Sequence, residues 1–254
     1  RKDLRIDNDP RSHPVWRSEQ VALNCTQRLV RLAQETGARV HVLHITSEEE
    51  IRFLAHHKDV ASCEITPHHL TMIAPDCYER LGTLAQMNPP VREARHRDAL
   101  WWGITQGVAD VLGSDHAPHT LEEKAKPYPH SPSGMTGVQT LVPLMLDHVH
   151  AGRLTLERFV DLTSAGVARL FGLATKGRIA AGYDADFTIV DLKRKETITR
   201  NWIASKSQWS PYEGQTVTGW PVGTIVRGRT VMWDGDLVTP SQGEPVLFNE
   251  ALPR

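Results

Sequence analysis

Residues 108–119 read VADVLGSDHAPH, an apolar run that turns abruptly into a polar loop. The run Val108–Gly113 is short and apolar, which predicts a strand with both faces buried. Asp115, His116 and His119 follow directly after its end. Because reactive side chains gather at the carboxyl ends of parallel strands, this loop is where the sequence predicts chemistry.

Upstream of this strand, helices and strands are predicted to alternate. Strands are predicted at Val40–Ile45 and Val60–Thr66, where the chain is short, apolar and rich in β-branched residues. Apolar periodicity and capping signals predict helices in the intervening segments, at 18–35, 47–57 and 95–107, and beyond the last strand at 138–151 and 155–162. This alternation is typical of βα units and predicts an α/β fold with a parallel sheet.

The sequence changes character after about Ala174. Residues 178–192 (RIAAGYDADFTIVDL) and 216–238 are punctuated by glycine and rich in β-formers. We therefore expect two domains. The first, at 1–174, carries the βα units, and the second, at 175–254, is a small β-rich domain with a C-terminal tail.

Bulk composition excludes several classes of function. The 254 residues carry a formal net charge of −1, which argues against nucleic-acid binding and anionic membrane surfaces. No apolar run approaches the roughly 20 residues that span a bilayer. The three cysteines, Cys25, Cys63 and Cys77, are widely spaced and predict neither a zinc ribbon nor a disulfide framework. We expect a reduced, cytoplasmic protein that acts on a small molecule.

Three predicted strand ends carry candidate ligands. They are His44, the pair His68-His69, and Asp115 with its neighbouring histidines. Imidazole and carboxylate groups are ligands that zinc favours. Simpler interpretations remain open, since a lone histidine can be a hydrogen-bonded core residue and a loop aspartate can cap a helix. Adjacent residues on a strand face opposite sides, so at least one of His68 and His69 is expected to be structural.

Longer motifs in the chain resemble those of dihydroorotases, a family of cyclic amidohydrolases. The most specific is GSDHAPHTLEEK at 113–124. The other matching segments are VLHITS at 42–47, EITPHHL at 64–70, NPPVR at 88–92, SGMTGVQT at 133–140 and KGRI at 176–179 with DAD at 184–186. The resemblance covers nearly the whole chain from about Asp9 to Leu237.

The resemblance implies both a fold and a reaction. The family fold is a distorted TIM (β/α)8 barrel with a small β-sandwich domain, and this chain would supply about the last three βα units. The reaction is the zinc-dependent, reversible conversion of dihydroorotate and N-carbamoyl-L-aspartate in pyrimidine biosynthesis. A bound metal lowers the pKa of water to about 7, and a neighbouring carboxylate can accept and deliver the proton.

The resemblance also implies individual roles. His44 and Asp115 would bind metal, and Asp115 would shuttle the proton. His119 would bind the substrate carboxylate, while Asn88 and the backbone near Gly134 would hold the ring. His68 and His69 are interpreted as structural.

The three βα units predicted here do not supply all the metal ligands of the dihydroorotase family. The H-x-H pair of the first strand, the bridging lysine or aspartate of the fourth and the histidine of the fifth are expected before Arg1, along with the other barrel strands. A missing first half is the favoured explanation, and a natural truncation or cleaved chain is the alternative. In either case, the 254 residues alone are expected to be inactive.

Two other functions compete with dihydroorotase. The first is a related cyclic amidohydrolase, such as a hydantoinase or allantoinase, whose simple hydantoin substrates lack the carboxylate that His119 would bind. The second is an inactive dihydroorotase-like subunit that scaffolds aspartate transcarbamoylase. We expect a homo-oligomer, possible association with aspartate transcarbamoylase, and one or two zinc ions.

Overall fold

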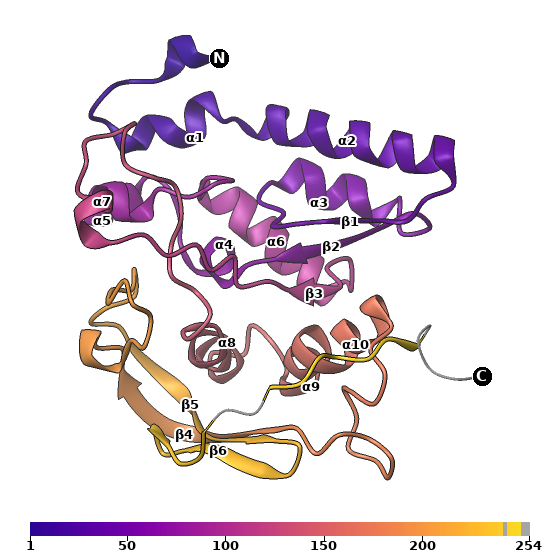
Figure 1. Cartoon of the computed structure of the whole chain (residues 1–254). Helices are drawn as coiled ribbons and strands as arrows, with labels where there is room; N and C mark the ends of the chain where they lie inside the picture. Colours follow the sequence, from indigo (N-terminus) through magenta and orange to yellow (C-terminus); the bar gives the residue numbers. More distant parts are fainter. Residues whose placement is uncertain (241–242, 250–254) are drawn as a thin grey trace. The chain divides into compact units, whose positions relative to one another are not determined.

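The computed structural model describes residues 1–240 and 243–249 (Figure 1). Within it the chain folds into two compact units. Unit 1 comprises Arg1–Leu141 and Thr199–Gly214, and unit 2 comprises Val142–Ile198 and the described residues from Gln215 onward. The domain boundary expected at 174/175 stays a prediction.

Unit 1 is built on a parallel sheet in the order β1-β2-β3, as the strand–helix alternation predicted. Its strands are Val40–Val42 (β1), Ala61–Ile65 (β2) and Val111–Leu112 (β3). In the register, Val40 pairs with Ala61 and Glu64 pairs with Val111. The side chains of Val42, Ala61, Cys63 and Ile65 are buried and belong to the core.

All three strands are shorter than predicted, and β1 and β3 are shortened for local reasons. β1 ends before His44, whose φ of 38° lies in the left-handed region and breaks the extended backbone. The residues before β3 are used by the preceding helix, because the N–H groups of Val108 and Ala109 both donate to the carbonyl of Gly103. An apolar run therefore overstates the length of a strand when its first residues close a helix.

The helices of unit 1 are α1 (His13–Trp16), α2 (Glu19–Thr36), α3 (Glu48–Ala55), α4 (Pro67–Thr71), α5 (Asp76–Leu81), α6 (Ala94–Thr105) and α7 (Leu121–Lys124). α2 lies along α3 (Figure 1), and its buried residues are Thr26, Val30 and Ala33. It ends where predicted, at Gly37, whose φ of 72° is the left-handed conformation that glycine adopts most readily.

Helix α3 begins at the predicted cap. The Ser47 hydroxyl accepts the backbone N–H of Glu50 at 3.3 Å and donates to the Glu50 carboxylate at 2.8 Å. α3 packs against α6 at a very close crossing, where a Cβ on Gly103 would lie 2.5 Å from Cγ1 of Ile51. Glycine at position 103 therefore sets the spacing of the two helices.

His68 and His69 follow the end of β2, as predicted, but the expectation that they lie on extended backbone is wrong. Both lie in α4, whose N-cap Thr66 accepts the backbone N–H of His69 at 3.4 Å. Pro67 occupies the first helical turn, where a missing N–H costs nothing. No regular element is predicted between the strand at Val60–Thr66 and the helix at 95–107, but this segment contains both α4 and α5.

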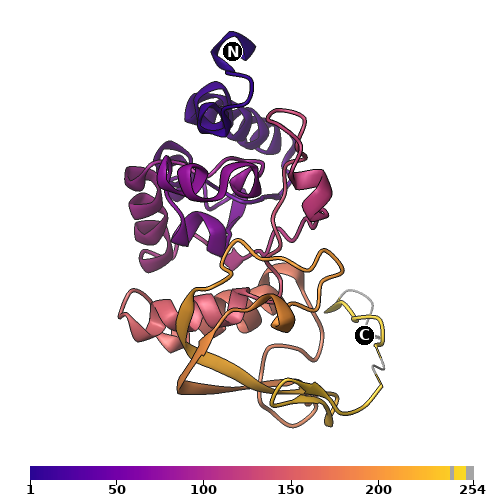
Figure 2. The ribbon, with the colours of Figure 1, turned by 90° about the vertical axis from the view of Figure 1, so that its left-hand side faces the viewer.

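Unit 2 combines three helices with an antiparallel sheet. The helices are α8 (Leu141–His150), α9 (Leu156–Val160) and α10 (Gly166–Phe171), and a π-turn at Asp161–Ala165 joins the last two. The helices lie beside the sheet (Figure 2), and the N–H of Thr218 donates to the Asp147 carboxylate at 2.9 Å. The helix predicted at 138–151 is present but shorter, whereas the helix predicted at 155–162 is continued by the π-helical segment and α10 to Phe171.

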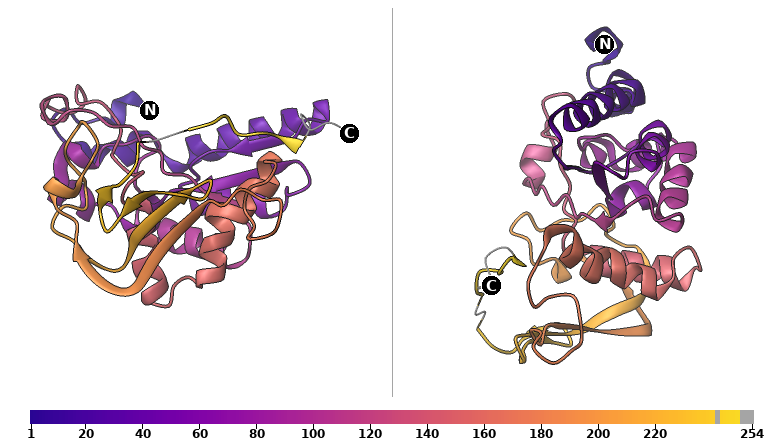
Figure 3. Two further views of the ribbon diagram at one scale, coloured as in Figure 1. Left: turned by 60° about the horizontal axis from the view of Figure 1, so that its bottom comes forward. Right: turned by 90° about the vertical axis from the view of Figure 1, so that its right-hand side faces the viewer.

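The sheet has the order β4-β5-β6-β7. Its strands are Phe187–Thr197 (β4), Thr216–Val226 (β5), Arg229–Trp233 (β6) and Asp236–Leu237 (β7). The two long strands, β4 and β5, lie side by side in both panels of Figure 3. This part of the chain is β-rich, as the glycine-punctuated sequence predicted.

No helix within residues 1–240 and 243–249 combines the length and the apolar character needed to cross a membrane.

Candidate active site

His44 occupies a special position just beyond the end of β1. Its backbone is left-handed, and its side chain is half-buried. The Nδ1 atom is buried and has no hydrogen-bond partner among the described residues. Because buried polar atoms are nearly always paired, an unpaired imidazole nitrogen just beyond a strand end makes His44 a candidate ligand-binding residue.

Asp115 occupies the corresponding position beyond β3. Its φ is 42°, so its backbone is left-handed like that of His44. Burial raises the pKa of the Asp115 carboxyl, nearby His44 lowers it, and nearby Glu64 raises it. His44 and Asp115 therefore lie close enough for the charge of one to affect the pKa of the other, and both follow the carboxyl ends of their strands.

Glu64 and His41 form a polar pair that sequence reasoning missed. Nε2 of His41 lies 3.4 Å from the Glu64 carboxylate, and Nδ1 of His41 lies 2.8 Å from the Ser62 hydroxyl. The Glu64 carboxylate also occupies the space that a Cβ on Gly113 would fill. Polar residues inside otherwise apolar strands were the signal, since His41 and Glu64 interrupt runs of core residues.

The polar loop after β3 packs directly on the segment 133–137. The N–H of Ala117 donates to the carbonyl of Met135 at 3.0 Å, and the N–H of Gly137 donates to Nδ1 of His116 at 3.0 Å. A Cβ on Gly134 would lie 2.5 Å from the carbonyl oxygen of Ala117. The segments 113–119 and 133–137 thus form one surface.

His119 lies at the edge of this surface. Its ring carbon Cδ2 would be 3.1 Å from a Cβ on Gly134, so the two residues predicted to bind substrate are neighbours. The backbone of His119 is held by Trp209, whose Nε1 donates to its carbonyl at 2.7 Å. The imidazole is partly exposed, with Nδ1 at 3.7 Å from the Glu123 carboxylate. It can therefore donate a hydrogen bond to an anionic ligand.

The loop that carries Asn88 contacts the segment 133–137. The carbonyl of Gln86 accepts the N–H of Gly134 at 2.9 Å. The Asn88 side chain is exposed, and its Oδ1 lies 3.1 Å from Nε2 of His13.

His68 and His69 are buried, and each imidazole makes a hydrogen bond, although Nε2 of His68 is buried with no partner among the described residues. Nδ1 of His68 contacts the Tyr212 hydroxyl at 2.8 Å, and Nε2 of His69 contacts the Pro89 carbonyl at 3.1 Å. Burial lowers the pKa of His68 to about 4 and that of His69 to about 3, so both are neutral at pH 7. These contacts agree with structural roles, and His69 ties α4 to the Asn88 loop.

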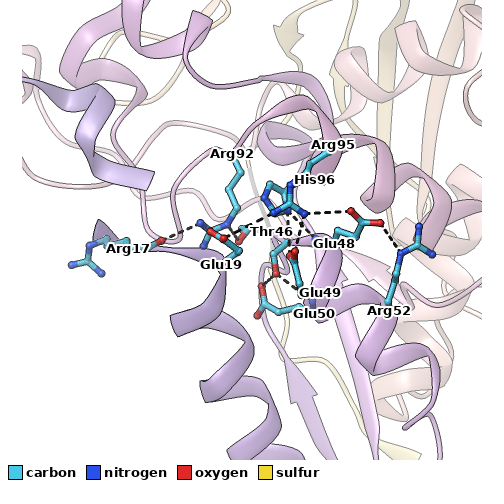
Figure 4. A network of polar contacts seen from close by, with 11 residues as sticks. Arg17, Glu19, Thr46, Glu48, Glu49, Glu50, Arg52, Arg92, Arg95 and His96 are labelled. Carbon is cyan, nitrogen blue, oxygen red and sulfur yellow. Dashed lines mark hydrogen bonds and ion pairs between the residues drawn. The ribbon is translucent and has the colours of Figure 1, made fainter. Parts of the chain in front are cut away.

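A network of charged groups supports the loop that follows His44 (Figure 4). The buried Arg92 donates to the Thr46 hydroxyl at 2.9 Å and to the carbonyl of Arg17 at 3.0 Å. At its exposed side, Arg95 binds the Glu49 carboxylate at 2.7 Å. Arg92 therefore joins the His44 loop to its own segment, which begins at Asn88.

A complete metal-ligand set does not occur within the part of the chain that the structure describes. No three histidine, cysteine, aspartate or glutamate side chains there are grouped to hold an ion. One H-x-H sequence does exist, His148-Val149-His150, but it lies in α8, where residues two apart do not share a face. It therefore differs from the strand motif of the family.

Polar side chains beyond the carboxyl ends of parallel strands, such as His44 and Asp115, lie where enzymes with βα folds carry their active sites. The chain belongs to the amidohydrolase family, whose sequence profile matches residues 19–231. Its relatives include the dihydroorotase of Halobacterium salinarum, 40% identical over 94% of this chain and 56% of that protein. The dihydroorotase of Methanothermobacter thermautotrophicus is 34% identical over 93% of this chain and 54% of that protein.

Similar solved structures carry other names within the same class. The L-hydantoinase of Arthrobacter aurescens has a TM-score of 0.82 and 34% identity, over 85% of this chain and 50% of that one. The dihydropyrimidinase of Brevibacillus agri has a TM-score of 0.85 and 27% identity, over 91% and 52%. The chain thus spans about half the length of the relatives that it matches.

Proposed function

We propose that this chain is the C-terminal, catalytic-face part of a dihydroorotase, acting reversibly on dihydroorotate and N-carbamoyl-L-aspartate in pyrimidine biosynthesis. The observation that carries the proposal is the pair His44 and Asp115. Both have left-handed backbones at strand ends, and Nδ1 of His44 is buried without a partner among the described residues. The named relatives support the choice of substrate.

The same pair fits part of a zinc site. An imidazole nitrogen and a carboxylate are two of the ligand types of catalytic zinc, which takes three or more protein ligands. The remaining ligands for one or two ions would come from residues outside this chain. Zinc, when bound, supplies a Lewis acid that activates water and polarises the scissile carbonyl.

The residues of this chain would perform the remaining steps. The Asp115 carboxylate accepts a proton from the attacking water and delivers it to the leaving ring nitrogen. His119 donates a hydrogen bond to the substrate carboxylate. Asn88 and the backbone at Gly134 hold the ring beside it, which the packing of segments 113–119 and 133–137 favours.

The whole protein would be larger than this chain. We propose that unit 1 contributes the last three βα units of a distorted TIM barrel, and that the strands after residue 174 contribute a small β-sandwich. We also propose that the whole protein is a cytoplasmic homo-oligomer that can associate with aspartate transcarbamoylase.

The test uses the full-length protein that contains this chain. We expect zinc by elemental analysis and turnover of dihydroorotate, and we expect Asp115→Asn to lower kcat on the order of a thousandfold or more while the protein stays folded. Turnover that survives Asp115→Asn contradicts the proposal. A folded wild-type protein with no turnover and no zinc favours the scaffold function. The isolated 254 residues are predicted to be inactive.

A hydantoinase-like activity is the second candidate, because the similar solved structures include hydantoinases and a dihydropyrimidinase. Dihydrouracil differs from dihydroorotate only in lacking the carboxylate, so the two compounds separate these functions. A dihydroorotase should prefer dihydroorotate strongly, and His119→Ala should reduce that preference. Equal kcat/KM for both compounds would favour the second candidate.

A further inference from the structure

The Asn88 side chain is held by a chain of hydrogen bonds from the N-terminal segment. Nε1 of Trp16 donates to the Tyr128 hydroxyl at 2.5 Å, and this hydroxyl lies 3.2 Å from Nδ1 of His13. On the other side of the His13 ring, Nε2 contacts the Met87 carbonyl at 3.0 Å and Oδ1 of Asn88 at 3.1 Å. Three residues distant from Asn88 in sequence thus determine its surroundings.

If the His13 imidazole is neutral, the chemistry of these partners permits only one arrangement of hydrogens. A carbonyl oxygen can only accept, so Nε2 of His13 must carry the proton that faces Met87. The indole N–H of Trp16 can only donate, so the Tyr128 oxygen accepts it and the Tyr128 hydrogen is free to point to Nδ1 of His13. His13 is therefore the Nε2–H tautomer.

Burial keeps this imidazole neutral. His13 is only 2% exposed, and its burial lowers its pKa to about 4, with Arg17 and Lys124 adding positive charge nearby. A neutral ring retains an acceptor at Nδ1 and a donor at Nε2 across the physiological range.

The tautomer in turn fixes the Asn88 amide. Because Nε2 of His13 donates, the atom of Asn88 that faces it must be the oxygen, and the amide NH2 must point away. The Asn88 side chain is exposed, and within residues 1–240 and 243–249 its NH2 group has no hydrogen-bond partner. Both of its hydrogens are available to a ligand.

We infer that His13 is a positioning residue that makes Asn88 a pure hydrogen-bond donor toward the site, so that Asn88 selects an acceptor group of the ligand, a carbonyl or carboxylate oxygen, over a ring N–H. This inference deepens the proposed function and rests on it, since it takes Asn88 to contact substrate. It excludes an Asn88 oxygen that accepts from the N–H groups of a dihydropyrimidine ring.

The hydrogen-bond arrangement is tested directly by NMR on the full-length protein. Two-bond 1H–15N spectra distinguish the two nitrogens of a neutral imidazole, and the signal of His13 is assigned by its loss in His13→Gln. We expect the Nε2–H tautomer at pH 7. An Nδ1–H tautomer or a charged ring would overturn the inference, whatever the protein catalyses.

The ligand contact is tested by the substitution Asn88→Asp, which has nearly the same shape. It retains an oxygen toward His13 and replaces only the outward NH2 with an oxygen. Calorimetric titration with dihydroorotate should show binding weakened on the order of a hundredfold, because two acceptors then face each other. Unchanged or tighter binding would mean that Asn88 does not donate to the ligand, and would overturn the inference.

The role of His13 is tested by a pair of variants. His13→Gln retains a donor that can reach Met87 and Asn88, whereas His13→Leu has none. His13→Leu should raise the Kd and KM for dihydroorotate about five- to tenfold with kcat little changed, and His13→Gln should restore most of the loss. Equal effects of both variants, or a loss of kcat alone, would contradict a positioning role.

A failure of the proposed function can be distinguished from a failure of the inference about His13 and Asn88. If the unmodified protein neither binds nor converts dihydroorotate, the proposed function is wrong, whereas the NMR result still decides the orientation of Asn88. If wild type binds dihydroorotate and the tautomer is Nδ1–H, the proposed function survives and this inference fails.

Discussion

Gly134 shows how a single backbone position limits the side chain it can hold. Its φ is 149°, and a Cβ there would lie 2.5 Å from the carbonyl oxygen of Ala117 and 2.8 Å from the Ala117 Cβ. Both neighbours belong to the polar loop after β3, so a side chain would push the two substrate-facing segments apart. The position thus requires glycine for conformation and for space.

We predict that Gly134→Ala destabilises the protein by about 2–4 kcal/mol, since backbone strain and a steric clash add together. Gly152→Ala is the matched control. Gly152 also has a positive φ, 72°, but nothing lies within 4 Å of its added Cβ, so a cost of about 1–2 kcal/mol is expected. Denaturant midpoints measure both. Equal costs would show that the contact with Ala117 is unimportant.

At this scale the sequence predicts His44 and Asp115 as candidate ligands, because each follows an apolar strand and belongs to a long motif. It did not identify Glu64, which lies near Asp115, or His13, which contacts Asn88. The contacts of these residues, to His41 and to Asn88, join segments that are 23 and 75 residues apart. A motif shows which residues are close in sequence, whereas these contacts are made only when distant strands and loops pack together.

Among the elements, the loop after β1 depends on a buried guanidinium. Arg92 is 5% exposed and donates to Thr46 and to the carbonyl of Arg17 from two different nitrogens. A lysine has one terminal nitrogen on a flexible stem and cannot reproduce this fork. The loop that carries His44 therefore needs arginine at position 92.

We predict that Arg92→Lys costs about 2–3 kcal/mol of unfolding free energy, since one or both buried acceptors lose a charged donor. Arg97→Lys is the control, because Arg97 is partly exposed and pairs with Asp98 at the surface, where about 0.5 kcal/mol or less is expected. Chemical denaturation separates the two. A small effect at position 92 would contradict the assigned role.

A second buried cation, Lys124, is the last residue of helix α7. Its Nζ donates to the carbonyls of Gln86, Pro132 and Gly134 at 2.9, 2.9 and 3.1 Å, and the side chain is fully buried. Burial lowers the pKa of Lys124 to about 8 from an ordinary value of 10.5. The folded protein thus releases this proton before the unfolded chain does.

The sign of the resulting pH dependence follows from proton counting. Between about pH 8 and 10.5 the unfolded state binds more protons at this lysine, so its contribution to stability rises with pH. We predict that the difference in unfolding free energy between wild type and Lys124→Met is flat from pH 6 to 8 and increases above it. The exposed neighbour supplies the control, since Lys126→Met should retain the wild-type slope. A flat difference up to pH 10.5 would refute the assignment.

The predicted element types agree with the structure in α2 and α3, where helical periodicity is strong, and in β2, a short apolar run. The helices α4 and α5 were missed because each is five or six residues long, too short for a periodic pattern to emerge. Their stability comes from caps and tertiary contacts, such as the Tyr78 hydroxyl that donates to the Val91 carbonyl at 3.2 Å. Local sequence does not encode such contacts.

At the scale of the whole molecule, the chain order and the packing order differ. The segment Thr199–Gly214 lies between two strands of unit 2 in sequence, yet it packs within unit 1. Trp209 is 1% exposed and donates to His119, and the Tyr212 hydroxyl contacts His68. Residues late in the sequence thus support the polar loop after β3, a connection that a linear division of the chain could not predict.

This arrangement predicts which part of the chain loses stability when Trp209 is replaced. Trp209→Phe removes the donor to the His119 carbonyl and leaves a small void, so about 2–4 kcal/mol of stability should be lost from unit 1. Hydrogen exchange should then become faster in residues 113–137, far away in sequence, while β4 and β5 on either side of the segment keep their protection. The control Trp233→Phe alters a ring that is 50% exposed in β6, and it should leave residues 113–137 unchanged. Faster exchange confined to β4 and β5 in Trp209→Phe would mean that the segment stabilises the unit that flanks it in sequence rather than the one that carries His44 and Asp115.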